Sequence, residues 1–395
     1  YYIYDNFDQL VCVLPPEAVK GIVKTSSEYL GLSDAIKETF LARWAFRYTH
    51  DSSRRITSKQ VPGAGPLYMV YDKRDRIVLT QDGNQRTDAS GNATKKEWTF
   101  TKYDALDRPV QSGIYTHATV INQADMQLHV NGEMNSGNQF YEDYNGVAAS
   151  EGYTNRVFPV SSTNILSVTY YDNYSFRSLW TGPFAYINDE LNQVRNGVTF
   201  SQPAAANPRV IGKVTGIKTK VLDGSNNWLK SVTYYDDRYR VVQTINENHK
   251  GGVDRVSNLF DFVGKILMTK TTHSTSIPTN RAVTRRFTYD HNGRLVETWH
   301  KIDAFPDVRL IFNKYNELGQ LVDKKLHSTE PLAANAKQSV DYRYNIRGWL
   351  TSLNNSTLTI ESSTNDEVGD YFGMNLGYHA DIGISNSGLF NGNIT

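Results

Sequence analysis

The chain has 395 residues with 42 basic and 41 acidic side chains, so its formal net charge is +1. This balance gives no reason to expect nucleic acid, an anionic membrane surface or a strongly charged substrate. The single cysteine excludes a disulfide within the chain, and no apolar run approaches the roughly 18 residues that a membrane helix needs.

Residues 1–112 alternate polar and aromatic side chains around short turns, which predicts β-hairpins. Residues 1–14 form the first expected hairpin, and 98–103 is a clearly alternating strand. Ser33 followed by an aspartate is typical of a helix start, so we expect a short helical insertion near 33–43. The first region is therefore predicted to be a set of hairpins interrupted by one helix.

Residues 113–165 break the alternation and are predicted to be an insertion between repeats. Within it, 117–129 has apolar residues at helical spacing, and an Asn-Gly pair that follows would end such a helix. Hairpin patterning returns over 166–395, except for an irregular loop near 174–209 that contains a possible helix over 187–195. Insertions of this kind lie on one face of a repeat array, which is sometimes the binding face.

One heptapeptide recurs throughout the hairpin regions. Its pattern is Tyr-Asp, two variable residues, a turn residue, a polar residue and an aliphatic one, as in Tyr289 to Leu295. Aspartate bonds backbone two residues on, and glycine takes the positive φ that closes a tight loop. The copies begin at the following first positions: Tyr4, His50, Tyr71, Tyr103, Tyr235, Phe260, Tyr289, Tyr315 and Tyr344.

The spacing of these copies indicates a repeat architecture. In the second half they begin at residues 235, 260, 289, 315 and 344, which gives steps of 25, 29, 26 and 29 residues. A further copy starts at Tyr171-Asp172 but does not finish. A single hairpin cannot bury its own aromatic face, so neighbouring hairpins must pack against one another.

Two positions of the motif have alternative interpretations. The aspartates at position two either form an acidic ladder that binds cations or each cap their own turn, and Asn316 and Asn345 favour capping because asparagine carries no charge. The ladder would comprise Asp5, Asp72, Asp104, Asp172, Asp236, Asp261 and Asp290. At position five, glycine or aspartate fits left-handed backbone, so Arg54 and Tyr239 are predicted to use another turn geometry.

The repeated Tyr-Asp-x-x-Gly-Arg-Leu units resemble those of the RHS/YD-repeat proteins, a family that includes bacterial polymorphic toxins, toxin-complex cocoon subunits and teneurins. Longer strings, such as Val13-Leu14-Pro15-Pro16 and the stretch from Tyr344 to Leu350, are similar to the bacterial subgroup. The resemblance covers nearly the whole chain. It implies an all-β fold with minor short helices, in which repeated hairpins form a spiralling antiparallel β-sheet shell around a C-terminal toxin or effector.

No motif of an enzyme is recognisable. Gly-x-Ser-x-Gly, His-Glu-x-x-His, phosphate-loop and Cys-x-x-Cys patterns are absent, as is the signature of the aspartate autoprotease that some family members carry. His117 and His129 would approach each other only by accident of folding, and basic pairs such as Arg54-Arg55 are interpreted as solvated. We assign no catalytic, cofactor-binding or metal-binding residue and expect no enzyme activity; a glycosidase would need a converging carboxylate pair, and none is apparent.

Two functional hypotheses follow. The first is a non-catalytic wall segment of a secreted or cell-surface bacterial shell that encapsulates a toxin. The second is a surface adhesin or carbohydrate-binding array, because aromatic rings can stack on sugars, although packing between hairpins is their commoner role. The expected partners are the remainder of a longer chain, of which this sequence is a piece truncated at both ends, its enclosed cargo and an export complex.

Overall fold

A computed structural model describes residues 1–23, 33–87, 94–137, 140–195, 197–277, 280–329, 336–361, 369–378 and 391–394. The chain divides into two compact units. Unit 1 comprises Tyr1–Gly182 and Ile211–Lys230, and unit 2 comprises Pro183–Val210 and Ser231–Thr395. None of the described helices is long and apolar enough to cross a membrane.

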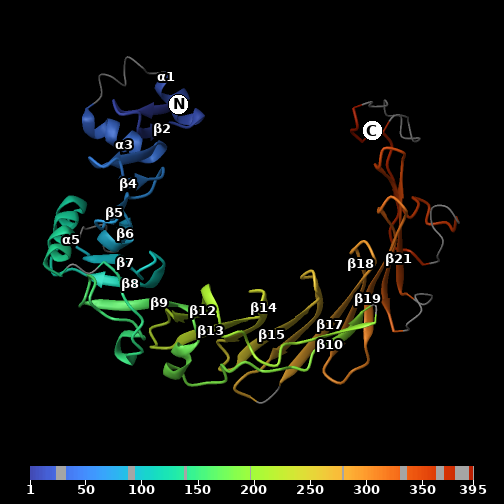
Figure 1. The fold of residues 1–395 in the computed structure, drawn as a ribbon. Coiled ribbons are helices and arrows are strands. Elements are labelled where there is room, and N and C mark those ends of the chain that lie inside the picture. Colours follow the sequence, from blue (N-terminus) through green and yellow to red (C-terminus); the bar gives the residue numbers. More distant parts are fainter. Residues whose placement is uncertain are drawn as a thin grey trace. The chain divides into compact units, whose positions relative to one another are not determined.

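In unit 1 each strand from β1 to β9 pairs antiparallel with the next one along the chain (Figure 1). The strands are β1 (Tyr2–Tyr4), β2 (Leu10–Val13), β3 (Phe46–His50), β4 (Ile56–Gln60), β5 (Leu67–Tyr71), β6 (Ile77–Gln81), β7 (Glu97–Tyr103), β8 (Pro109–Thr116) and β9 (Thr163–Asp172). Strand β12 (Val210–Lys220) pairs with β9.

Unit 2 repeats the same antiparallel order from β13 to β23. Its strands are β13 (Trp228–Tyr235), β14 (Val241–Glu247), β15 (Val253–Phe260), β16 (Ile266–His273), β17 (Arg281–Tyr289), β18 (Leu295–Ile302), β19 (Val308–Tyr315), β20 (Leu321–Ser328), β21 (Gln338–Tyr344), β22 (Leu350–Leu353) and β23 (Met374–Asn375). The predicted fold class, an all-β array of antiparallel hairpins, is confirmed.

Each copy of the heptapeptide closes one hairpin through a β-bulge. In the β17–β18 hairpin, Tyr289 is opposite Leu295 while Thr288 is opposite Glu297, so the register shifts by one residue beside the turn. The same shift occurs at the first position of every other copy. A bulge bends its strand and increases the local twist, so the motif fixes the hairpin geometry as well as its turn.

The helices of unit 1 follow the sequence prediction in part. They are α1 (Pro16–Val23), α3 (Asp34–Trp44), α4 (Gly83–Arg86) and α5 (Gln123–Gly137), with 3₁₀ turns η1 (Ala148–Ser150) and η2 (Ser175–Leu179). Helix α3 confirms the short helix expected near 33–43. Helix α1 was not expected; it begins at Pro16, a position where the missing N–H of proline leaves no helical bond unmade.

The helix predicted over 117–129 is displaced and longer. It begins at Gln123 and continues through Gly132. A glycine inside a helix destabilises it by about 1 kcal/mol relative to alanine. Met126, Val130 and Met134 recur at intervals of four residues and are buried against the sheet, so tertiary packing offsets that cost. The expected stop signal was therefore overridden by burial.

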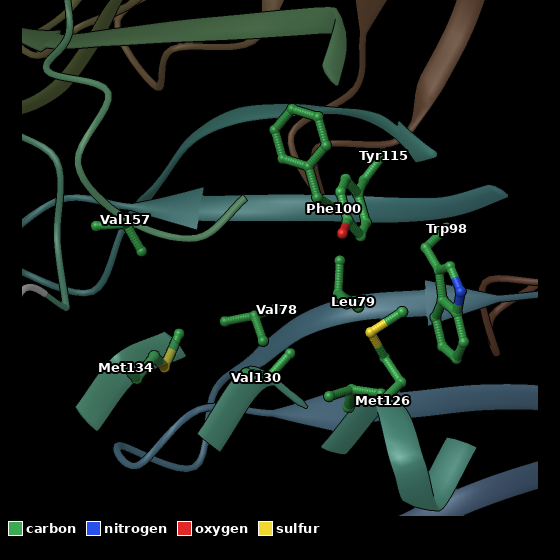
Figure 2. Packing of buried hydrophobic residues seen from close by; sticks show 10 residues of the cluster. Val78, Leu79, Trp98, Phe100, Tyr115, Met126, Val130, Met134 and Val157 are labelled. Carbon is green, nitrogen blue, oxygen red and sulfur yellow. The ribbon is translucent and has the colours of Figure 1, made fainter. Parts of the chain in front are cut away.

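The core of unit 1 lies between α5 and strands β5 to β8. Figure 2 shows the methionines and valine of α5 facing the strand side chains. Its buried members are Val70, Val78, Leu79, Trp98, Phe100, Tyr115, Met126, Val130, Met134 and Val157.

Two glutamines of α5 take the place of a paired strand along β5. The register of β4 with β5 extends only to Tyr68. Beyond it, Gln123 Nε2 donates to Met69 O at 2.8 Å. The Gln127 amide accepts from Tyr71 N at 2.9 Å and donates to Tyr71 O at 2.7 Å. Gln123 and Gln127 are four residues apart on one face of the helix, so their side chains reach Met69 and Tyr71, which are two residues apart on the strand. Backbone groups of β5 beyond the pairing with β4 are thereby hydrogen-bonded.

In unit 2 the segment 183–210, here called the strap, lies against the strands β14 to β17. It contains β10 (Asn192–Arg195), which pairs antiparallel with β11 (Val198–Ser201). The helix predicted over 187–195 is therefore wrong. Its backbone is held extended by side chains: Ile187 N donates to Gln243 Oε1 at 3.0 Å, and Asp189 N donates to Gln202 Oε1 at 2.8 Å.

A buried carboxylate anchors the strap. Asp189 accepts from Arg255 Nη2 at 2.9 Å and from Ser257 Oγ at 2.5 Å, and Lys270 Nζ lies 3.2 Å away. Burial alone would raise the pKa of Asp189, but the hydrogen bonds from Arg255 and Ser257 more than offset it and lower that pKa. The strap is therefore held by an ionised group within the sheet face.

Candidate functional site

The second residue of the heptapeptide organises each turn. Asp72 Oδ1 accepts from Arg74 N at 2.9 Å and from Arg76 N at 3.0 Å. The same two bonds, to the residues two and four positions on, occur at Asp5, Asp51, Asp104, Asp236, Asp261 and Asn345. The capping interpretation is confirmed at these turns, because the oxygen that a cation would need is used locally.

The prediction of a different geometry at Arg54 and Tyr239 is wrong. Their φ angles are 64° and 61°, in the same left-handed region as Asp75 at 61° and Asp107 at 62°. Tyr239 N donates to Asp236 O at 3.1 Å, as its counterparts do. The hydrogen bonds of the Asp cap and of the paired strands on either side fix the backbone of the turn. A non-glycine residue with left-handed backbone is therefore tolerated there despite its strain.

The sixth residue connects one hairpin to the next. Arg76 Nε donates to Asp72 Oδ2 at 2.8 Å within its own turn, and Nη1 donates to Asp107 Oδ1 of the following repeat at 2.6 Å. Its guanidinium carbon lies 4.7 Å from the ring centre of Tyr103. We call this arrangement a repeat joint. A sixth-position cation covers a first-position ring at Arg55–Tyr71, Arg76–Tyr103, Arg108–Tyr171, Arg240–Phe260, Lys265–Tyr289 and Arg294–Tyr315.

The first-position tyrosine completes the joint with its hydroxyl group. Tyr103 OH donates to Ile77 O, the carbonyl of the seventh residue of the preceding repeat, at 2.6 Å. The same bond is made by Tyr71, Tyr171, Tyr289, Tyr315 and Tyr378. Phe260 has no hydroxyl, and there Asn258 Nδ2 donates to Val241 O at 3.1 Å instead. The packing interpretation of the tyrosines is confirmed at these joints.

The fifth position faces the cation of the preceding repeat, which explains why both aspartate and glycine occur there. Asp107 accepts directly from Arg76. At Gly293 the backbone carbonyl accepts from Lys265 Nζ, and a Cβ atom at Gly293 would lie 1.8 Å from that nitrogen. Glycine thus supplies the φ of 76° and also leaves room for the lysine.

One joint takes its guanidinium from the strap. The Phe260 repeat carries Lys265 at position six, and Asp261 Oδ2 accepts instead from Arg195 Nη1 of β10 at 2.7 Å. Arg195 also lies 5.6 Å from the ring centre of Tyr289, and its Nη2 donates to Asp290 O at 3.3 Å. Arg195 therefore supplies the guanidinium group that other repeats carry at position six, although it lies more than 60 residues from Asp261 in the sequence.

The last joint in the described residues uses a ring in place of a cation. Trp349, at position six of its repeat, lies 5.1 Å from Tyr378 between ring centres. Tyr378 OH donates to Leu350 O at 2.8 Å, the standard bond of a joint. The unfinished copy at Tyr171-Asp172 also forms a joint, because Arg108 binds both carboxylate oxygens of Asp172, at 2.9 and 2.6 Å.

The joints perturb the ionisation of their members. Burial raises the pKa of the Tyr71, Tyr103 and Tyr289 hydroxyls, which therefore remain hydrogen-bond donors at neutral pH. The side-chain hydrogen bonds of Arg108 lower the pKa of Asp172. Burial opposes the effect at Asp51, yet the backbone and side-chain bonds from Arg55 still lower its pKa.

The role of the sixth position as a linking residue was not predicted. The position was expected only to be polar and Arg54-Arg55 to be solvated, whereas Arg55 pairs with Asp51 at 2.7 Å and with Asp75 at 2.6 Å. The recurrence of a basic residue one place after the turn was the available signal. No comparable signal marks Arg195, since it lies outside any copy of the motif.

The buried polar side chains of unit 1 include a lysine that is held by structural partners. Lys102 is buried, and its Nζ donates to Glu142 Oε1 at 3.0 Å and to Asn155 Oδ1 at 2.7 Å. Burial lowers the pKa of Lys102, which Glu142 partly opposes. Among the residues that the structure describes, no group of three or more His, Cys, Asp or Glu side chains is placed to hold a metal ion.

The two histidines expected to be scattered lie together. The rings of His117 and His129 have centres 5.2 Å apart, because α5 packs against the end of β8. Tyr115 and Phe158 make edge contacts with the same pair. The cluster is aromatic packing around two imidazoles, and no third ligand joins it within the described residues.

Comparisons with known proteins give structural neighbours only. No protein-family model matches the chain, and no curated protein matches it in sequence. The chain aligns with crystal structures of TcdB2-TccC3-Cdc42 and TcdB2-TccC3-TEV at 10% and 9% identity, each with a TM-score of 0.32 over 96% of this chain. It spans 18% of the length of each of those chains. The Photorhabdus luminescens Tc holotoxin pore aligns at 12% identity with a TM-score of 0.21. Likeness of this degree carries no conclusion about function.

Proposed function

We propose that this chain is a non-catalytic wall segment of a hollow β-shell that encloses a C-terminal toxin or effector. The observation that carries the proposal is the recurrence of one joint along the chain. In most joints the aspartate, the cation and the aromatic ring of the motif fasten a hairpin to its neighbour, so these side chains serve wall-building.

Side-by-side hairpins suit a wall for two physical reasons. Consecutive strands pair with each other, so the interior strands leave no edge that could recruit foreign strands. At the joint of the Tyr71 repeat, two carboxylates, Asp72 and Asp107, pair with two guanidinium groups, Arg76 and Arg74, which agrees with a net charge of +1 for the chain. A neutral surface is compatible with enclosing cargo of varied charge.

Electron microscopy of the full-length parent protein tests the proposal. We expect closed, hollow particles, with the C-terminal portion protected from added protease until the particle is opened by denaturant. A matched variant in which Arg76 and Arg108 are both replaced by methionine should give open or broken particles. A solid globule, or a flexible string in the unmodified protein, would contradict the proposal.

The proposal extends to location and partners. A shell of this kind would be secreted or displayed on a bacterial surface, and its partners would be the rest of its own chain, the enclosed cargo and an export complex. Fractionation of the producing cells should recover the full-length protein from the medium or the outer surface. If the cargo acts outside the cell but the full-length protein is recovered only from the cytosol, the proposed location is contradicted.

A further inference from the structure

A polar pocket in unit 1 takes no part in any repeat joint. It has a volume of about 280 Å³ and lies where residues 149–165 meet β7, β8 and β12. Its lining includes Phe100, Lys102, Gln111, Asn155, Lys220 and Trp228. A concave site that combines a few convergent polar groups with apolar walls is the usual form of a small-molecule site.

The floor of the pocket supplies a hydrogen-bond donor. Lys102 is 2% exposed and its ammonium group has three N–H bonds, of which Glu142 and Asn155 accept two. No acceptor for the third N–H lies among the described residues, so it can donate to a ligand oxygen. Because Glu142 is fully buried beside it, the floor pair Lys102–Glu142 presents this donor without adding net charge.

The rim of the pocket carries an unneutralised positive charge. Lys218 Nζ pairs with Glu151 Oε2 at 2.6 Å. Lys220 Nζ donates to the neutral Asn164 Oδ1 at 2.9 Å and has no carboxylate partner among the described residues. The lining residues Lys102 and Glu151 are each paired with an opposite charge outside the lining, Glu142 and Lys218, whereas Lys220 is not. One positive charge remains at the rim, enough for a single anionic group.

The walls favour a ring that is polar at its edge and apolar on one face. Gln111 uses its Nε2 to bond Ser150 O at 2.9 Å, which leaves its Oε1 as an acceptor. Asn226 is exposed at the opening and offers a further amide. Trp228 is half-buried and supplies aromatic surface beside these polar groups; Lys218 Nζ lies over its ring, 4.3 Å from the ring centre.

We propose that this pocket binds an acidic monosaccharide unit such as a hexuronic acid. The carboxylate lies at Lys220, the hydroxyl groups bond Lys102 and the side-chain amides, and an apolar face of the sugar ring lies toward Trp228. The proposal does not depend on the wall function, because no lining residue belongs to a joint.

Titration of the 395-residue chain with D-glucuronic acid, followed by saturation-transfer NMR and calorimetry, tests the proposal. Glucuronic acid should bind saturably and about tenfold more tightly than D-glucose, because the two sugars differ only at C6, where a carboxylate replaces the hydroxymethyl group. The Lys220→Gln variant should bind both sugars equally. Lys59→Gln removes the same charge from an exposed position on β4, and it should leave the preference unchanged.

A second variant and a further ligand separate the alternatives. Asn226→Ala should weaken both sugars several-fold, and the change is structurally mild because that side chain is exposed. Acetate should bind far more weakly than glucuronic acid. The proposal is overturned if glucuronic acid shows no saturable binding, if acetate binds equally well, or if the Lys220 and Lys59 variants behave alike.

Discussion

Replacement of Arg76 by methionine is the sharpest test of the repeat joint. The Arg76 side chain is 10% exposed, and its guanidinium group has four partners: the fully buried Asp72 carboxylate, Asp107 of the next repeat, the ring of Tyr103 and the carbonyl of Phe140. A second arginine, Arg74, stands two residues earlier in the same turn and pairs with the same Asp107 at 3.0 Å. The turn therefore carries its own matched control.

The expected destabilisation can be worked from these contacts. Removing one partner of a buried ion pair costs about 3–5 kcal/mol, and the lower end applies because Asp72 keeps its two backbone N–H bonds. Loss of the contact with the Tyr103 ring adds about 0.5–1 kcal/mol. Arg76→Met should thus cost about 3–4 kcal/mol. The exposed Arg74–Asp107 pair should be worth less than about 1 kcal/mol.

Native-state hydrogen exchange is the appropriate assay, because an array of repeats opens locally and a single global transition is not assured. The opening free energy should fall in Arg76→Met for the amides of residues 72–76 and 104–107. Arg74→Met should shift the same amides by less than about 1 kcal/mol. Equal shifts in the two variants would refute the reasoning, because the buried joint would then contribute no more than a surface ion pair.

Three further outcomes are expected. Tyr103→Phe should lower the local opening free energy by about 1 kcal/mol, whereas Tyr4→Phe, at an exposed ring, should change nothing measurable by the same exchange experiment. Arg195→Ala should lower the opening free energy of the amides of residues 260–266, and adding Lys265→Arg should restore it. If this second change gives no rescue, Arg195 does not serve in place of a sixth-position arginine. The pKa of Asp172 is lowered in the folded chain, so ionised Asp172 stabilises its joint fully above the unfolded pKa of about 3.9. This stabilisation is lost as pH falls through the lower folded pKa, and an NMR titration of the carboxyl group would follow the loss. A loss of stability at this joint between pH 5 and 8 would count against that assignment.

The sequence predicted those features whose partners lie within a few residues of each other. The Asp cap rests on contacts across two to four residues, as in the turn from Asp72 to Arg76, and the all-β class and the repeat period followed from the recurrence of that local motif. Such contacts form wherever the local pattern occurs, so they could be read directly from the chain. The hairpin bulge between Tyr289 and Leu295 was not predicted, although it lies within the motif.

The sequence alone determined that this protein is a series of capped, aromatic hairpins. Only the tertiary structure decided which cation lies on which ring, that Arg195 serves Asp261, and that Gly132 lies inside a helix rather than at its end. These outcomes depend on strand register and on connections of widely different length. A residue's neighbours across a sheet are set by the packing of whole elements, whereas its neighbours in a turn are set by the backbone itself.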